Sequence, residues 1–120
     1  MSRPTIDIDH FRKGLDLFNR ARFFDAHEAW EDVWRSAPVD DKKFFQGLTQ
    51  LAVAFHHHST GNLVGACSVM HRGLRNLANY PLYHSGIHLN RLLSDVSQWL
   101  DALEKGLPLP PHPRVHTSNH

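Results

Sequence analysis

The residues best suited to chemistry lie in one short segment, 23–34, which reads Phe-Phe-Asp-Ala-His-Glu-Ala-Trp-Glu-Asp-Val-Trp. If the segment is helical, a step of roughly 100° per residue places His27 and Glu31 on one side, among the aromatic residues. A buried carboxylate is costly unless a metal, a basic partner or hydrogen-bond donors satisfy it. The pattern therefore predicts that His27 and Glu31 are largely buried and form either a site or a buried polar network.

The spacing of these residues also allows metal chemistry. His27-Glu28-Ala29-Trp30-Glu31 matches the His-Glu-x-x-His pattern with its last histidine replaced by glutamate. In that pattern residues i and i+4 bind zinc and the intervening glutamate acts as general base. By analogy, His27 and Glu31 are candidate ligands of a divalent metal ion and Glu28 the candidate catalytic base. No obvious third ligand follows downstream, so only the local geometry is retained and the zinc-protease fold is rejected.

A structural interpretation of the same pair stays open beside the metal site. His27 and Glu31 are one helical turn apart, which is the spacing of an ordinary intrahelical pair. A second group of polar residues forms a stripe on an otherwise apolar segment and consists of Gln46, Gln50 and His57. If the two segments pack together, we expect this stripe to approach His27 and Glu31, where it would bind substrate or support the ligands. Hydrogen bonding between helices is the alternative role for the glutamines.

The surrounding sequence predicts the elements that position these residues. Apolar residues recur at helical spacing over about 9–20, 23–35, 40–59, 62–79 and 87–105. Asp7 or Asp9, Asp40 and Asn62 are candidate N-caps, and Gly106 and Pro108 end the last helix. We expect an all-α fold, an antiparallel bundle of about five helices packed as hairpins, with no sheet and with 40–59 the most buried helix. The predicted core comprises Phe18, Phe24, Trp30, Trp34, Leu48, Leu51, Phe55, Met70, Leu74, Val96 and Leu100.

Length and composition bound the remaining possibilities. The chain has 120 residues and a formal net charge of +1, so we expect one domain over 1–107 and no nucleic-acid partner. We expect residues 108–120 to form a disordered or extended tail that contributes little to stability. The single cysteine, Cys67, excludes an intrachain disulfide, and no apolar run approaches a membrane span, so we expect a cytoplasmic protein with no membrane partner. A homo-oligomer is left open.

Three blocks of the sequence resemble a known family. They are residues 18–34, residues 45–54 and residues 61–66, and the resemblance extends over roughly 11–103. Together they are similar to domain-of-unknown-function family 309 (DUF309), small all-α proteins labelled predicted metal-dependent hydrolases. By position, the family's polar signature falls on His27, Glu28, Glu31, Gln46 and Gln50.

Two functions of different classes follow from these observations. The first is a metal-dependent hydrolase that uses a divalent ion as cofactor. The second is a non-enzymatic helical binding or scaffold module in which the cluster is a structural polar network.

Overall fold

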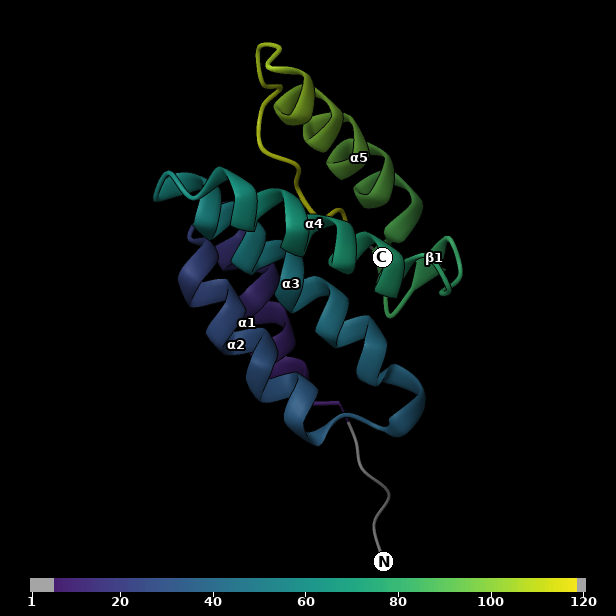
Figure 1. The fold of residues 1–120 in the computed structure, drawn as a ribbon. Coiled ribbons are helices and arrows are strands. Elements are labelled where there is room, and N and C mark those ends of the chain that lie inside the picture. The colour runs from purple at the N-terminus through teal and green to yellow at the C-terminus, as the bar shows by residue number, and fades with distance from the viewer. Residues whose placement is uncertain (1–5, 119–120) are drawn as a thin grey trace, which may run out of the picture.

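The computed structural model describes residues 6–118, and these residues form five α-helices and one very small hairpin (Figure 1). The helices are α1 (Ile8–Asn19), α2 (Phe23–Ser36), α3 (Lys42–Ser59), α4 (Leu63–Leu77) and α5 (Leu89–Lys105). A short 3-10 turn, η1 (Val39–Asp41), precedes α3. The predicted all-α class is confirmed.

Local signals set the ends of these helices. The carboxylate of Asp7 accepts a hydrogen bond from the backbone N–H of His10 at 3.1 Å and caps α1. The side chain of Asn62 caps α4 in the same way, through the N–H of Gly65 at 3.0 Å. Gly106 ends α5 in the left-handed conformation, with φ of 66°, which glycine adopts without strain. These three caps were predicted from the sequence, but the predicted cap Asp40 is wrong, since it lies within η1 and α3 begins after Asp41 without a side-chain cap.

The expectation that the chain has no sheet is wrong in one place. The strands β1 (Tyr83–His84) and β2 (Ile87–His88) pair antiparallel. The two residues between them, Ser85 and Gly86, both have positive φ, as a tight hairpin turn requires. Strands of two residues are too short to produce the alternating pattern by which a strand is recognised in a sequence.

Helix α3 is the centre of the bundle. It packs against α2 on one side and α4 on the other, and α1 packs on α2. Helix α5 lies beyond α4, which gives the molecule a long dimension of 52 Å (Figure 1). The backbones of α3 and α4 approach closely where Gly47 faces Gly73, since a Cβ added at Gly73 would lie 3.1 Å from the carbonyl oxygen of Gly47. Gly47 and Gly73 therefore allow α3 and α4 to pack closely.

An aromatic cluster joins the helices through the core. Phe55 of α3 contacts Phe18 of α1, stacks on Phe23 of α2 at 5.1 Å between ring centroids, and meets Trp99 of α5 at 4.8 Å. Most of the predicted core is buried, but Phe24 is 50% exposed, and Trp34 and Leu74 are only partly buried. The assignment of Phe24 was wrong, whereas Trp34 and Leu74 pack against the core from its edge. The buried face of α2 passes instead through its small residues and their neighbours, namely Phe23, Ala26, Ala29, Trp30 and Val33.

Residues 107–118, called the strap below, turn back along the helices in extended conformation (Figure 1). The indole Nε1 of Trp99 donates to the carbonyl of Pro110 at 3.1 Å, and Val115 is 3% exposed. Near its end the strap pairs with β2 through an antiparallel bridge between Ile87 and Thr117. The strap thus links α5, α1 and the hairpin, which are contacts that a detached tail lacks.

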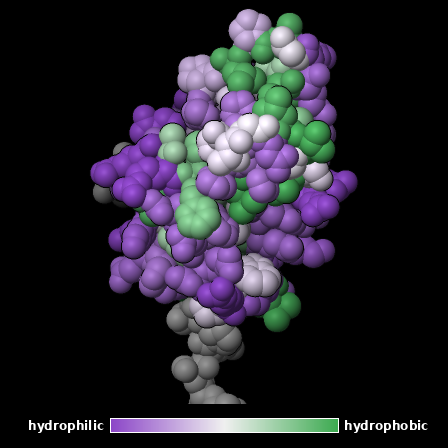
Figure 2. All heavy atoms as spheres, turned by 60° about the vertical axis from the view of Figure 1, so that its left-hand side comes forward, coloured by the Kyte–Doolittle hydropathy of each residue, from purple (hydrophilic) through white to green (hydrophobic). Residues whose placement is uncertain are grey.

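The outer surface is mostly hydrophilic. Figure 2 shows hydrophobic side chains gathered in the upper part of the face that it presents, toward the end of the molecule that carries the C-terminus of α5. Leu107 and Leu109, which follow α5, are among the exposed apolar side chains. Within residues 6–118, no helix combines the length and the apolar character needed to cross a lipid bilayer.

Candidate functional site on helix α2

The predicted pair lies on the outer side of α2 and is held by its own helix. His27 Nε2 is 3.1 Å from Glu31 Oε2, and His27 Nδ1 is 3.1 Å from the backbone carbonyl oxygen of Phe24. The side chains of His27 and Glu31 are 22% and 34% exposed. The prediction that both are largely buried is therefore wrong. Of the four aromatic residues that defined the predicted arc, Phe23 and Trp30 are buried, whereas Phe24 is exposed and Trp34 only partly buried.

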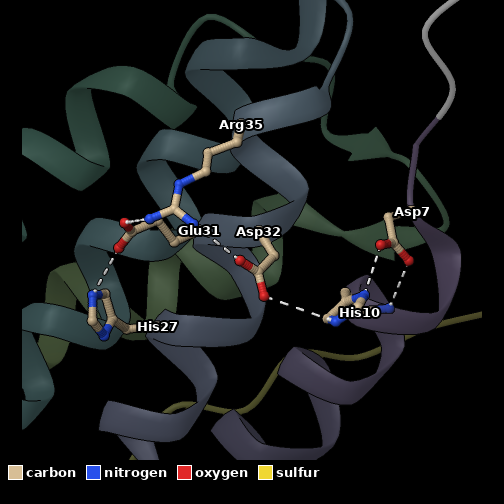
Figure 3. A network of polar contacts seen from close by, with 6 residues as sticks. All are labelled: Asp7, His10, His27, Glu31, Asp32 and Arg35. Atoms are coloured by element: carbon tan, nitrogen blue, oxygen red, sulfur yellow. Dashed lines mark hydrogen bonds and ion pairs between the residues drawn. The ribbon is translucent and has the colours of Figure 1, made fainter.

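Arg35, one turn further along α2, satisfies the carboxylate of Glu31. Its guanidinium donates to Glu31 Oε1 at 2.6 Å and to Asp32 Oδ1 at 3.2 Å. Both oxygens of Glu31 are thus engaged, one by His27 and one by Arg35 (Figure 3). Of the three ways to satisfy this carboxylate, the protein uses a basic partner at i+4.

The contacts continue from α2 to the start of α1. His10 Nε2 lies 3.8 Å from Asp32 Oδ2, and His10 Nδ1 lies 2.6 Å from Asp7 Oδ2 (Figure 3). Hydrogen bonding from the His10 backbone N–H holds the pKa of the Asp7 carboxyl below its ordinary value. The result is one network on the surface of α1 and α2, called the α2 network below, whose members are Asp7, His10, His27, Glu31, Asp32 and Arg35.

The two ring nitrogens of His27 decide what this residue can bind. One faces a carbonyl oxygen and the other a carboxylate oxygen, and both of these atoms accept hydrogen bonds. In the neutral ring one nitrogen carries the N–H and can donate to its acceptor, while the other keeps a lone pair. A metal ligand uses such a lone pair. Both nitrogens of His27 therefore face acceptors within α2 and not an open position.

The polar stripe of α3 is divided among different neighbours. Gln50 accepts a hydrogen bond from Asn76 of α4 at 2.7 Å, which is the helix-to-helix role considered from the sequence. His57 lies 3.5 Å from the side chain of Asn62 at the α3–α4 turn. Within residues 6–118, no hydrogen bond or ion pair joins the stripe to His27 or Glu31. The structure nevertheless brings part of the stripe near Glu31, around a shallow hollow of about 180 Å³ lined by Glu31, Trp34, Gln46, Thr49 and Gln50.

Glu28 is exposed and borders two hollows on the surface of α2. It lines a hollow of about 460 Å³ between α1 and α2, together with His10, Lys13 and Asp32. It also borders a smaller hollow of about 170 Å³ beside His27 and Glu31. Across the part of the chain that the structure describes, no three histidine, cysteine, aspartate or glutamate side chains are grouped so that they could hold a metal ion. The two expected ligands, His27 and Glu31, are therefore not joined by a third such side chain within the described residues.

The sequence analysis missed four of the six members of the α2 network. Asp7, His10, Asp32 and Arg35 were not expected at the site, although a signal existed for Arg35, which lies four residues after Glu31. His10 and Asp32 come from different helices, and only the packing of α1 on α2 brings them together.

Comparison with known sequences places this geometry in a family. Residues 11–69 match the family described as "Domain of unknown function (DUF309)". These residues belong to the DUF309 family. The match covers nearly all of α1, then α2, α3 and the first half of α4, and so includes His27, Glu28 and Glu31. The resemblance predicted from the sequence is confirmed over this range, while α5 and the strap lie outside it.

Two relatives of this chain are also uncharacterised proteins. One, from Aquifex aeolicus, is 26% identical over 122 residues, which cover 90% of this chain and 37% of the relative. The other, YpuF from Bacillus subtilis, is 38% identical over 76 residues, which cover 62% of this chain and 41% of the relative. This chain therefore spans about two fifths of the length of these relatives.

Proposed function

We propose that this DUF309 domain is a non-enzymatic helical binding or scaffold module and that the α2 network has a structural role. One observation carries the proposal: both oxygens of Glu31 and both ring nitrogens of His27 already face partners within α2. A catalytic or metal-binding group needs at least one free acceptor or donor aimed at its ligand. Here the polar atoms are directed at one another.

The α2 network supports the position of α2 more than it adds to global stability. Its ion pairs are substantially exposed, and exposed pairs contribute only about 0–1 kcal/mol each. The contact between His10 and Asp32 crosses from α1 to α2, near the start of α1 and in the second half of α2. It therefore orients the two helices, whose buried faces are held together by the core.

A metal-dependent hydrolase, which the resemblance implies, has less support from this geometry. The expected ligands His27 and Glu31 are paired with each other at 3.1 Å, and Arg35 places a positive charge on the same carboxylate. A cation bound there would have to displace that guanidinium. We derive no catalytic step for Glu28. A cytoplasmic location stays a prediction, supported by the single cysteine.

The experiment that tests the proposal measures metal content and thermal unfolding together. We expect no stoichiometric metal in purified protein and no rise in Tm with added Zn²⁺ or Mn²⁺. Glu31→Gln should lower stability by about 1 kcal/mol or less, since an amide keeps part of the hydrogen bonding to a partly exposed partner.

Glu28→Gln is the matched control because Glu28 is exposed on the same helix and has no ion pair in the described residues. We expect it to leave Tm nearly unchanged. A bound ion whose stabilising effect disappears in Glu31→Gln but persists in a conservative surface variant would refute the structural role and restore the metal site.

A further inference from the structure

Part of the strap lies in a groove lined by aromatic side chains at the junction of three helices. The groove, called the aromatic groove below, consists of Phe23 of α2, Phe55 and His58 of α3, and Trp99 of α5. The ring of His112, in the strap, stacks on Trp99 at 5.7 Å between centroids with an interplanar angle of 25°. It also meets the rings of Phe23 and Phe55 at 5.2 and 5.7 Å.

The strap has the composition of a proline-rich ligand. Four of its residues are proline, at 108, 110, 111 and 113. Each proline fixes φ near −65° and removes a backbone N–H, so the segment favours an extended conformation and keeps its carbonyl oxygens free to accept. Trp99 uses this property, since its Nε1 donates to the carbonyl of Pro110 at 3.1 Å. Aromatic rings that pack on the chain and donate to its carbonyls are a common way of binding proline-rich segments.

The next part of the strap is also recognised through its backbone. The side-chain amide of Asn19 donates to the carbonyl of Val115 at 2.9 Å, and its oxygen accepts from the N–H of Val115 at 2.7 Å. Both bonds would form with any residue that has a backbone N–H at this position. The aromatic groove and Asn19 together favour an extended chain with prolines, and the burial of Val115 favours an apolar side chain at that position. Most of these contacts do not require the strap to belong to the same chain.

The strap does not close its contact with α5 completely. A hollow of about 300 Å³ remains between them, bordered on the α5 side by Arg91, Asp95 and Gln98. A segment beside an unfilled hollow can be displaced more readily than one packed on every side.

We propose that the aromatic groove is a binding site for proline-rich extended segments of a partner protein, with the strap as its intramolecular occupant and competitor. The inference rests on the proposed binding function and names a class of partner for it. Because the strap is tethered directly to α5, its effective concentration is on the order of millimolar, so an external segment binds well only when the strap is displaced.

The test uses the full chain and a fluorescent synthetic peptide with the sequence of residues 107–118. Val115→Asp places a carboxylate where the side chain is 3% exposed, so it should release the strap without changing the groove. We expect the peptide to bind this variant at least about 10-fold more tightly than the wild type, as measured by fluorescence anisotropy.

Two controls tie the binding to the groove. Adding Trp99→Phe to Val115→Asp removes the indole N–H and should weaken binding of the peptide about 5-fold or more. A peptide with its four prolines replaced by alanine loses its preference for the extended form and should also bind about 5-fold more weakly. A peptide affinity that is unchanged both by Trp99→Phe and by replacement of the four prolines would overturn the proposal.

Strap release is verified independently by a shift of the Trp99 indole resonance with an unchanged helical circular dichroism spectrum. A released strap without peptide binding at millimolar concentration would overturn the proposal. If Val115→Asp unfolds the protein, a protease site placed after Gly106 in the full chain allows the strap to be cut in the folded state. The cut strap should then exchange with the labelled peptide, and failure to exchange contradicts the proposal.

Sedimentation and metal analysis distinguish two other outcomes from the proposed binding of a partner segment. If sedimentation shows that the released variant forms dimers that exclude the peptide, the occupant is a second copy of the chain and the partner-protein assignment is wrong. A metal ion found at His27 and Glu31 would refute the structural role of the α2 network but would leave these peptide measurements unaffected.

Discussion

Gly14→Ala tests the contact by which α1 positions α2. In an ordinary helix this change is stabilising by about 1 kcal/mol because alanine has the higher helix propensity. Here Gly14 lies under the indole of Trp30, and a Cβ at position 14 would lie 2.2 Å from Nε1 and 2.3 Å from Cδ1 of Trp30. Trp30 is fully buried, and its Nε1 donates to the carbonyl of Phe11 at 3.2 Å. The indole therefore has to move, and its hydrogen bond is strained or lost.

The magnitude follows from the opposing contributions. Overpacking a buried site costs about 1–3 kcal/mol. Loss of the hydrogen bond from a buried N–H costs about 1–3 kcal/mol more. After subtracting the gain of about 1 kcal/mol in helix propensity, we expect Gly14→Ala to destabilise the protein by about 1–5 kcal/mol. For a chain of this size, each kcal/mol lowers Tm by about 4 °C.

Urea unfolding followed by circular dichroism measures this change, with Lys13→Ala as the control at an exposed position of α1. The control should stay within about 0.5 kcal/mol of wild type. Trp30→Phe supplies the decisive comparison because phenylalanine lacks the pyrrole ring that covers Gly14. In that background Gly14→Ala should cost clearly less than in the wild type. A Gly14→Ala protein more stable than wild type would refute the reasoning.

Three further predictions concern the aromatic junction and the strap. Phe55→Ala should cost about 3–5 kcal/mol in urea unfolding, since this buried ring joins aromatic residues of three other helices and a smaller loss would contradict that role. Burial, reinforced by His58, lowers the pKa of His112 from 6.5, so the neutral ring is favoured in the fold. Stability from His112 is therefore complete above pH 6.5 and is lost as pH falls through the lowered value. Tm should fall more steeply between pH 7 and 5 in wild type than in His112→Leu, and equal slopes would contradict the assignment. Deleting residues 111–120 should lower Tm by roughly 5–15 °C, whereas an unchanged Tm would support the sequence-based prediction of a disordered or extended tail that contributes little to stability.

The helices could be predicted because their signals are local. Asp7 and Asn62 each cap a helix through a backbone N–H three residues away, and such pairs are visible in the sequence. The strap could not be predicted in this way. Asn19 and Val115, which hold it to α1, are separated by 96 residues, and an extended segment with four prolines shows no apolar period. Only the packed bundle brings these two residues together.

The candidate site was predicted in part, and its error has a specific cause. The helical wheel assumed that large aromatic residues mark the buried face of α2, but Phe24 is 50% exposed while Ala26 is fully buried. Small residues mark the face where neighbouring helices approach most closely, so the centre of the face is shifted away from His27 and Glu31. The requirement that Glu31 find a partner was correct. The partner, Arg35, lies four residues after Glu31, a spacing that can be read directly from the sequence.

The extent of the DUF309 match bears on both proposals. The matched residues, 11–69, contain most of the α2 network and the Phe23, Phe55 and His58 side of the aromatic groove. They contain neither Trp99 nor the strap.

Phe23 and Phe55 are buried in this protein partly because Trp99 and His112 cover them. Without α5 and the strap, the matched part of the domain would expose these two rings at one end of α2 and α3. Burial of large aromatic rings is favourable by several kcal/mol, so this end of the domain needs a covering segment. The strap supplies it here within the chain, and the same physical need is what a proline-rich segment of a partner would satisfy in its place.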